Sequence, residues 1–380
     1  MSLLSNKMKN QNVTYVFEIG RKDRLADEDS SKEFYYGYHH FSKEFKSVNL
    51  IELKNINFKN NNFIYFFDKL LRKLTNLPFH FSRVNNKKIY GDFKNADIII
   101  FSTERSAMSS MLIIKKLKKK KNVKTLVIVM GLFVKPVNNF ISKFLQKVSI
   151  NFFLNIYDNI VFLSRTEFEI AKTKYPKFNN KLFYLPFSVD TDFWKVEKEM
   201  NFTKKDKIIF IGNDGRRNFD KVIEIAKKLP QYNFLFVTEK IDEEKIQSSN
   251  VTLIKGHWNL NLLSDNEIKK MYSQSRISLI PLINSLQPSG QSVAQQSMAM
   301  GVPVIISKTD GFWDYEKYQN NENIIFQDNE DVDSWIKAIE DLYENQDKVS
   351  YISTNGLNLI KETNNLDNFY KNLKKILALD

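Results

Sequence analysis

The sequence lacks several features that identify common protein classes. It contains no cysteine, which excludes disulfide bonds, cysteine-ligated zinc or iron–sulfur sites and a thiol nucleophile. Glycine (11 residues) and proline (8 residues) are scarce in a chain of 380, which excludes collagen-like and linker-like sequences. No apolar run reaches the roughly 18 residues of a membrane-spanning helix, and the first residues lack the apolar segment of a signal peptide. We therefore expect a cytoplasmic protein that is soluble or peripheral to the inner face of a membrane.

What the sequence does contain is typical of a folded protein with more than one domain. Hydrophobic residues make up 42% of the chain and charged residues 27%, a mixture that supplies packed cores and excludes wholesale disorder. The length allows two domains of ordinary size.

Charge is divided unequally along the chain, whose formal net charge is +13. Residues 1–189 hold 33 Lys+Arg and 15 Asp+Glu, whereas residues 190–380 hold 24 and 29. The balance is +18 in the first half and −5 in the second, which predicts two domains with different partners.

The densest cluster of lysines follows an apolar segment at residues 111–114. A second basic stretch, residues 133–154, is interleaved with phenylalanines. Such mixtures suit an anionic membrane surface, at roughly 1 kcal/mol per lysine. The alternatives are a solvated helix end in a lysine-rich chain and, less favoured because the second half is acidic, a nucleic-acid surface. The predicted membrane-surface residues are Lys115, Lys116, Lys118, Lys119, Lys120 and Lys121.

Short, nearly continuous apolar runs alternate with segments long enough for helices, as in a parallel sheet that is buried on both faces. One such helix, residues 219–229, has an apolar stripe at helical spacing and ends at Pro230. The expected strands are residues 13–19, 48–53, 96–102, 124–130, 159–164 and 181–186 in the first half and 207–212, 233–238, 251–254, 277–281, 302–307 and 323–326 in the second.

This alternation predicts an α/β fold with two Rossmann-like, doubly wound parallel-sheet domains that face a cleft. We expect a basic N-terminal domain at residues 1–189 and a C-terminal domain at residues 190–364. The remaining residues, 365–380, are expected to form a helix that packs back on the N-terminal domain.

Two glycine-bearing segments of the second half are suited to binding a ligand. Residues 208–220, IIFIGNDGRRNFD, run from a strand through a turn with two arginines into a helix. Backbone N–H groups at a helix start and a nearby guanidinium make a diphosphate site, although an ordinary βα turn with exposed arginines has the same sequence pattern. Residues 287–305, QPSGQSVAQQSMAMGVPVI, predict a small-residue turn, a helix over residues 292–300 and a strand. The Ser289 and Ser292 hydroxyls and the helical glutamines favour a polyol ligand over a purely structural βαβ unit.

The second segment resembles the signature of the "glycosyl transferases group 1" enzymes, which have the GT-B fold. That signature reads E-G-F-G-x-x-x-x-E-A-M-A-x-G-x-P-V-I, and the match is close over SMAMGVPVI at residues 297–305. Residues 262–281 are similar to the helix and strand that precede the signature in this family. Residues 184–194, YLPFSVDTDFW, are similar to its interdomain segment. The resemblance covers roughly residues 155–330.

The resemblance implies transfer of a sugar from a nucleotide diphosphate donor, here a UDP- or GDP-sugar, with no other cofactor. Pro288 replaces the first signature glutamate, so contacts to the donor sugar pass to the backbone of Ser289, Gly290 and Gln291. The second signature glutamate hydrogen-bonds to ribose hydroxyls, and Gln296 stands in its place.

In the family, an arginine and a lysine after the first C-terminal strand bind the diphosphate. Following Gly212, Asn213 occupies the arginine position, Arg217 matches the lysine, and Arg216 is the substitute for the lost cation. His257 is placed where the family's backbone lies against the donor base.

The reaction asks for positive charge on the leaving diphosphate, and Arg216 and Arg217 are suited to supply it without a metal. In the first half, Glu104 follows the third expected strand, where it either acts on the acceptor or forms a surface pair with Arg105. Asp190 and Asp192 match a D-x-D metal motif, but they lie in the interdomain segment and we interpret them as structural.

We therefore expect a glycosyltransferase whose acceptor is a lipid, a lipid-linked saccharide or a cell-surface glycan. The alternatives are a nucleotide-sugar epimerase or hydrolase of the same fold, and a catalytically inactive nucleotide-sugar-binding protein.

Overall fold

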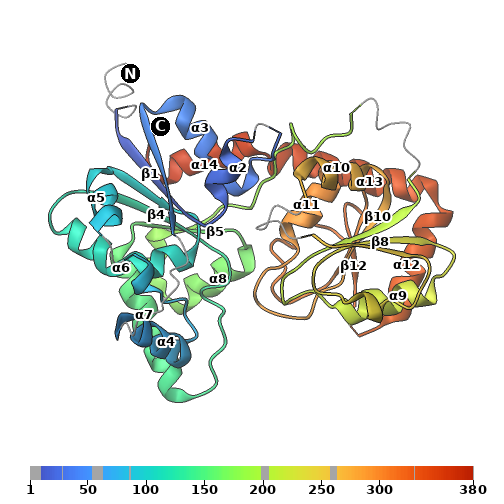
Figure 1. Cartoon of the computed structure of the whole chain (residues 1–380), viewed down its shortest axis with the longest axis horizontal. Helices are drawn as coiled ribbons and strands as arrows, with labels where there is room; N and C mark the ends of the chain where they lie inside the picture. The colour runs from blue at the N-terminus through green and yellow to red at the C-terminus, as the bar shows by residue number, and fades with distance from the viewer. Residues whose placement is uncertain are drawn as a thin grey trace. The chain divides into compact units, whose positions relative to one another are not determined.

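The computed structural model describes residues 10–27, 29–53, 63–84, 87–197, 205–256, 263–328 and 330–379. The chain divides into two compact units (Figure 1). Unit 1 comprises residues 1–26, 34–186 and 369–380, and unit 2 comprises residues 27–33 and 187–368. Residues 27–33 thus belong to unit 2 although the sequence on both sides of them belongs to unit 1.

Unit 1 is built on a six-stranded, wholly parallel sheet with the strand order β2-β1-β3-β4-β5-β6. Its strands are β1 (Asn12–Glu18), β2 (Ser47–Leu53), β3 (Ile98–Phe101), β4 (Lys124–Val129), β5 (Asn159–Phe162) and β6 (Leu182–Tyr184). The helices around it are α2 (Arg21–Leu25), α3 (Tyr38–Glu44), α4 (Phe63–Thr75), α5 (Lys87–Asn95), α6 (Glu104–Lys118), α7 (Phe140–Ile156) and α8 (Arg165–Lys174), with 3-10 turns at Phe81–Arg83 and Pro176–Lys181.

Unit 2 is a second six-stranded parallel sheet with the order β12-β11-β10-β7-β8-β9. Its strands are β7 (Lys207–Ile211), β8 (Asn233–Val237), β9 (Val251–Ile254), β10 (Ser275–Ile280), β11 (Val304–Ser307) and β12 (Ile325–Gln327). Its helices are α9 (Phe219–Lys228), α10 (Asp265–Ser273), α11 (Gln291–Ala299), α12 (Val332–Glu344) and α13 (Gln346–Thr363), and a 3-10 turn covers Glu243–Lys245. Read from its first strand, this is the dinucleotide-binding Rossmann order 3-2-1-4-5-6.

The α/β architecture predicted from the sequence is confirmed, and every expected strand occurs within a few residues of its predicted bounds. The strands could be predicted because a strand that is covered by helices on both faces must be apolar along its whole length. β3 and β11 are such strands, since they are buried at every position. The predicted helix is α9. Asn218 caps it by accepting the Lys221 N–H, and its apolar stripe packs into the core of unit 2.

The chain returns to unit 1 through α14 (Leu366–Ile376), whose residues from Phe369 onward belong to that unit. Lys374 Nζ lies 2.8 Å from Glu44 Oε1 of α3, and Tyr370 donates a hydrogen bond to the same carboxylate. These contacts hold α14 against α3 of unit 1. No described helix is long and apolar enough to cross a membrane.

Candidate functional site

The strand order of unit 2 reverses between β7 and β10, which are neighbours in the sheet although β8 and β9 lie between them in the chain. In open α/β sheets, ligands bind beyond the carboxyl ends of the strands at such a switch point. Both glycine-bearing segments start there: the first follows β7 and the second follows β10. The topology therefore brings together the two segments that the sequence identified separately.

The turn after β7 holds the Arg217 side chain against the backbone. The side chain is 4% exposed, and Nε donates to the Ile211 carbonyl at 3.3 Å. A Cβ at Gly212 would lie 2.3 Å from Nε, so glycine is needed for this close approach. Burial lowers the pKa of the Arg217 guanidinium and the Asp214 carboxylate, 3.1 Å away, opposes that shift. The guanidinium stays charged, because arginine does not deprotonate in proteins.

The turn after β10 meets this arginine. Arg217 Nη1 donates to Ser289 Oγ at 3.1 Å, and Ser289 Oγ in turn lies 3.2 Å from Asp214 Oδ2. Arg216, which is half-buried, donates from Nη2 to Gln287 Oε1 at 3.3 Å. The two predicted segments are thus joined side chain to side chain.

Helix α11 starts at this point. Gly290 is its N-cap residue with φ +78°, and no side chain caps the first N–H groups of the helix. An uncapped helix N-terminus carries a partial positive charge and suits an oxyanion. Gln291 is buried in the first turn and Ser292 is half-buried beside it.

Asn213 has a structural function. Its side-chain amide donates to the Gly256 carbonyl at 2.6 Å, and its oxygen accepts from Glu239 N at 2.7 Å and Thr238 Oγ1 at 3.0 Å. Asn213 thereby ties the ends of β7, β8 and β9 together at the switch point. His257, which was predicted to lie against the donor base, is outside the described residues.

Gln296 is buried, and its amide donates to Glu33 Oε1 at 2.8 Å. The same oxygen accepts from Trp194 Nε1 at 2.9 Å. Glu33 is 1% exposed, and burial raises the pKa of its carboxyl to about 7. Sequence reasoning missed Glu33 and Trp194, because neither carries a motif and residue 33 is 263 positions from residue 296.

Asp190 of the D-x-D sequence is buried, and its carboxylate accepts hydrogen bonds from backbone N–H groups. Its carboxylate accepts the N–H of Phe193 and that of Lys32, at 3.2 Å each. Among the residues described, no group of three or more histidine and acidic side chains is arranged to hold a metal ion.

Unit 1 has its own switch point, between β1 and β3. Glu18 ends β1, and Thr103 caps α6 directly after β3; Thr103 Oγ1 donates to Glu18 Oε1 at 3.4 Å. The next residue, Glu104, accepts the Met130 N–H at 3.2 Å, at the end of β4. Burial raises the pKa of the Glu104 carboxyl, and it also raises that of the neighbouring Glu167 to about 7. Glu104 is therefore a carboxylate with a raised proton affinity at the carboxyl edge of the sheet.

The predicted membrane-surface lysines occupy the last turn of α6 and the residues after it. Lys115, Lys116, Lys119 and Lys120 are exposed. Lys115 Nζ lies 4.6 Å from the centroid of the Phe152 ring, and Lys116 Nζ lies 5.7 Å from that of the Tyr90 ring. The other two form polar contacts: Lys118 Nζ lies 2.6 Å from Asp158 Oδ2, and Lys121 Nζ donates to the Ala96 carbonyl at 2.6 Å.

Comparison with known protein families finds a match in the second half of the chain. Residues 192–359 match the family model described as "Glycosyl transferases group 1", which confirms the resemblance seen in the sequence. Among curated protein sequences, none matches the chain.

Many solved structures are similar to the chain, and the following three are similar over nearly its whole length. Alr3699/HepE of Anabaena in complex with UDP-glucose has a TM-score of 0.66 at 11% identity, over 97% of this chain and 100% of that one. Sucrose-phosphate synthase of Thermosynechococcus elongatus has a TM-score of 0.69 at 13% identity, over 97% and 98%. A glycosyltransferase of Rickettsia africae has a TM-score of 0.65 at 14% identity, over 97% and 98%. At such low identity the similarity extends to the fold, and it confirms the predicted GT-B class.

Proposed function

Because the chain belongs to the glycosyl transferases group 1 family through residues 192–359 and has the GT-B fold, we propose that it transfers a sugar from a nucleoside diphosphate sugar to a lipid, lipid-linked or glycan acceptor. The observation that carries this proposal is the junction of Arg217 with Ser289 at the switch point of unit 2. Unit 2 would bind the donor and unit 1 the acceptor.

Departure of the diphosphate concentrates negative charge on its oxygens, and fixed positive groups aimed there lower the barrier. Arg216, Arg217 and the uncapped N-terminus of α11 are such groups, joined in one place by the contacts described above. Because these three supply the positive potential, we propose that the reaction needs no metal. Ser289, Gly290, Gln291 and Ser292 would bind the phosphate and sugar oxygens.

Gln296 would face the ribose, since its amide can both donate and accept. The signature glutamate is absent at residue 296, but the hydrogen bond from Gln296 to Glu33 places a carboxylate directly beside the Gln296 side chain. Alr3699/HepE, which has the same fold, was solved with UDP-glucose. We therefore propose a UDP- or GDP-sugar as the donor.

On the acceptor side, Glu104 is our candidate for the group that takes the proton of the attacking hydroxyl. Its raised pKa suits a general base better than an ordinary exposed carboxylate would. Its place after β3, at the switch point of unit 1, is where this architecture binds ligands.

A membrane-bound acceptor is supported by the surface of unit 1. Ten of the sixteen large apolar side chains that are exposed among the described residues lie on α4, α6 and α7, including Phe140 at 84% and Phe63 at 81%. Helix α7 packs against both α4 and α6. Neither α4 nor α7 has an exposed acidic residue, since α7 has none and Asp68 of α4 is buried. Exposed aromatic rings among lysines are suited to the headgroup region of an anionic bilayer.

A thermal-shift series with UDP, GDP, ADP and their sugar conjugates tests the donor site. A nucleotide at about 100 times its Kd should stabilise the protein by about 2.7 kcal/mol. Arg217→Lys keeps the charge but cannot bond Ile211 and Ser289 together, so the shift should disappear and kcat should fall by about 10²–10³.

Arg276→Lys is the matched control, because Arg276 is a half-buried arginine of unit 2 that donates to the Leu342 and Tyr343 carbonyls and lies over the Tyr343 ring, away from the candidate donor site. It should keep the nucleotide shift. If no nucleotide stabilises the wild-type protein, or if both variants lose the shift equally, the proposed donor site is wrong.

The absence of both signature glutamates favours a second candidate, a binding protein without transfer activity. The family fold also serves nucleotide-sugar epimerases and hydrolases. Chromatography of the donor after incubation separates the three: a new glycoside marks transfer, a free or epimerised sugar marks the enzymes without an acceptor, and unchanged donor marks the binding protein.

A further inference from the structure

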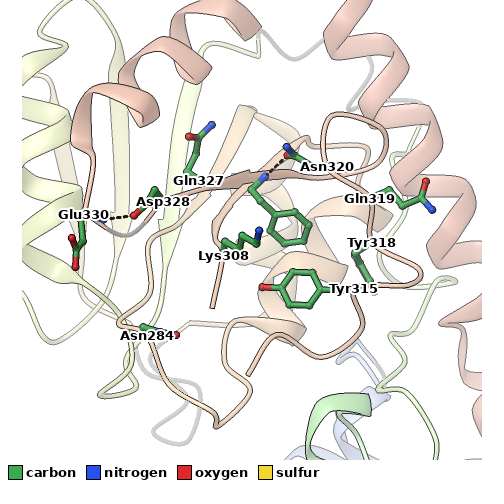
Figure 2. Close-up of a pocket in the computed structure, with 10 residues that line it drawn as sticks. Asn284, Lys308, Tyr315, Tyr318, Gln319, Asn320, Gln327, Asp328 and Glu330 are labelled. Atoms are coloured by element: carbon green, nitrogen blue, oxygen red, sulfur yellow. Dashed lines mark hydrogen bonds between the residues drawn. The ribbon is translucent and has the colours of Figure 1, made fainter. Parts of the chain in front are cut away.

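Unit 2 contains a cavity whose lining residues are not part of the proposed donor site. It has a volume of about 740 Å³ and lies at the carboxyl ends of β11 and β12, beside the loop after β10 (Figure 2). Its lining combines aromatic rings, side-chain amides and charged groups. These groups come from the loop after β10, from the segment that follows β11, and from the end of β12 and the residues after it.

The aromatic part of the lining is a rigid platform. Tyr315 is 40% exposed, and its ring centroid is 5.3 Å from that of Phe326. Phe312 supports both rings, with centroid separations of 4.7 and 4.8 Å. The Tyr315 hydroxyl donates to the Thr309 carbonyl at 2.7 Å, which fixes the orientation of the ring. A ring held in this way presents apolar area at little entropic cost.

The polar part of the lining is held in place by backbone bonds. Asn320 Oδ1 accepts the Phe326 N–H at 2.8 Å, and Asp328 Oδ1 accepts the Glu330 N–H at 2.8 Å. Figure 2 shows Asp328 and Glu330 on the opposite side of the cavity from Tyr318 and Gln319. With Asn284, Gln319 and Gln327, the cavity is lined by four side-chain amides. Asn284 bonds Asp310 through both its nitrogen and its oxygen, at 3.0 and 2.9 Å, whereas the Gln319 and Gln327 amides can donate to a ligand and accept from it.

This combination fits a saccharide. A sugar ring presents C–H groups on one face, which pack on an aromatic ring, and hydroxyl groups at its edge, which pair with amides and carboxylates. The lining contains one cation, Lys308, and two anions, Asp328 and Glu330. That balance disfavours a diphosphate, so the ligand of this cavity differs from the donor of the switch-point site.

The cavity and the candidate donor site share one loop. Asn284 lies on the segment after β10 that continues to Ser289 and Gly290. The loop after β11 packs tightly against that segment, because a Cβ at Gly311 would lie 2.4 Å from the Leu286 carbonyl carbon. A ligand in the cavity would therefore contact a segment that is continuous with the donor turn.

We propose that this cavity is a subsite for a neutral or amino-sugar saccharide, which, resting on the proposed function, would bind unit 2 beside the donor turn. The subsite would retain a glycan through Tyr315 and the amides, independently of the nucleotide.

The test is saturation-transfer NMR of the full chain with maltotriose, cellotriose and chitotriose, without nucleotide. At least one trisaccharide should bind at millimolar concentration. Tyr315→Ala should weaken that binding about tenfold, the size of a single aromatic contact. Gln319→Ala should also weaken trisaccharide binding. Because this variant leaves the aromatic rings in place, it tests the subsite even if Tyr315→Ala disturbs the fold. Tyr351→Ala, which removes an exposed tyrosine from α13, is the matched control.

Absence of binding by all three trisaccharides, or equal loss in the Tyr315 and Tyr351 variants, overturns the proposal. A nucleotide thermal shift in the same variants separates it from the proposed function. If the subsite alone is wrong, the wild-type protein still responds to nucleotide. If the donor site alone is wrong, trisaccharide binding and its loss in Tyr315→Ala persist without any response to nucleotide.

Discussion

Glu33 is a buried carboxylate whose two oxygens have different surroundings. Oε1 accepts hydrogen bonds from Trp194 and Gln296, whereas Oε2 has no hydrogen-bond partner among the described residues. The pKa of the Glu33 carboxyl is raised to about 7, because burial and the nearby Asp265 carboxylate raise it by more than the hydrogen bonds from Gln296 and Trp194 lower it. At neutral pH, ionisation of Glu33 thus places a half-satisfied charge in the interior.

The pKa of Glu33 predicts a stability change with pH. The unfolded carboxyl ionises near 4.5 and the folded one near 7, so the folded state binds the proton more tightly and loses stability as pH rises between those values. Glu33→Gln keeps an acceptor for Trp194 and Gln296 and removes the charge. Its Tm relative to wild type should rise from pH 5 to pH 8, corresponding to about 3 kcal/mol at most.

Tryptophan fluorescence is the suitable probe, because all four tryptophans fall within residues 187–368 of unit 2. Glu167→Gln is the contrasting variant. The pKa of Glu167 is also raised to about 7, but its two oxygens accept the Gly131 and Phe133 N–H groups at 2.6 and 2.9 Å. An amide there must point an N–H at an N–H and should destabilise by about 1–3 kcal/mol. A Tm difference for Glu33→Gln that is constant from pH 5 to pH 8 would contradict the assigned pKa.

The contrast between Gln296 and Glu33 shows which residues of the candidate site a sequence can reveal. Gln296 was predicted because it stands at the second glutamate of the family signature, one helical turn from Ser292. Glu33 lies in a short segment between β1 and β2 with no motif, and only the folding of residues 27–33 into unit 2 brings it to Gln296. Arg217 was predicted for its charge, whereas its burial against Ile211 could not be, because this depends on the close approach that Gly212 permits.

At the scale of single elements, the N-terminus of α11 depends on Gly290. Its φ of +78° is unfavourable for any residue with a Cβ, and a Cβ there would also lie 2.8 Å from Ile280 Cγ2 of β10. Gly301, which ends the same helical segment, has φ +66° but open space around it. A side chain at Gly301 would therefore cause backbone strain alone, whereas one at Gly290 would cause backbone strain and a steric overlap with β10.

Alanine substitutions at three glycines test this difference. Gly301→Ala should cost about 1–2 kcal/mol, the strain of a left-handed residue. Gly290→Ala should cost more, because β10 must shift as well, and it should also weaken nucleotide binding. Gly215→Ala should change stability by less than about 0.5 kcal/mol, since nothing lies within 4 Å of its Cβ and its φ is not positive. Urea unfolding followed by tryptophan fluorescence gives the order, and equal losses for Gly290 and Gly301 would refute the steric contribution.

The strands could be predicted from the sequence, whereas the exposure of the apolar face of α4 could not, because an apolar pattern does not show what covers a face. A run such as IIIF at residues 98–101 has no polar position, so it must be buried on both faces. Helix α4 is amphipathic, and an amphipathic pattern predicts which residues share a face without indicating what covers it. Phe63, Phe66 and Phe67 would be taken for core residues by pattern alone, yet they are exposed at 81%, 66% and 43%.

At the scale of the whole molecule, the charge division and the apolar face belong to the same unit. Residues 1–189, which carry the balance of +18, include α4 and α7 with their exposed aromatic rings and α6 with the exposed Leu112. The positive charge alone would be an ordinary solvated surface, and the apolar rings alone an aggregation risk. Together they suit a surface that is anionic outside and apolar beneath.

Vesicle sedimentation tests this arrangement. The protein should bind vesicles that contain phosphatidylserine, bind neutral ones weakly, and dissociate as salt is raised. Changing Lys115, Lys116, Lys119 and Lys120 together to Gln should weaken binding about a thousandfold, at about 1 kcal/mol per lysine. The matched control changes four exposed lysines of unit 2, Lys227, Lys317, Lys337 and Lys361, and should have little effect. If both sets weaken binding equally, net charge alone accounts for it and α6 has no particular function at the membrane; if neutral vesicles bind equally well, the lysines do not contribute.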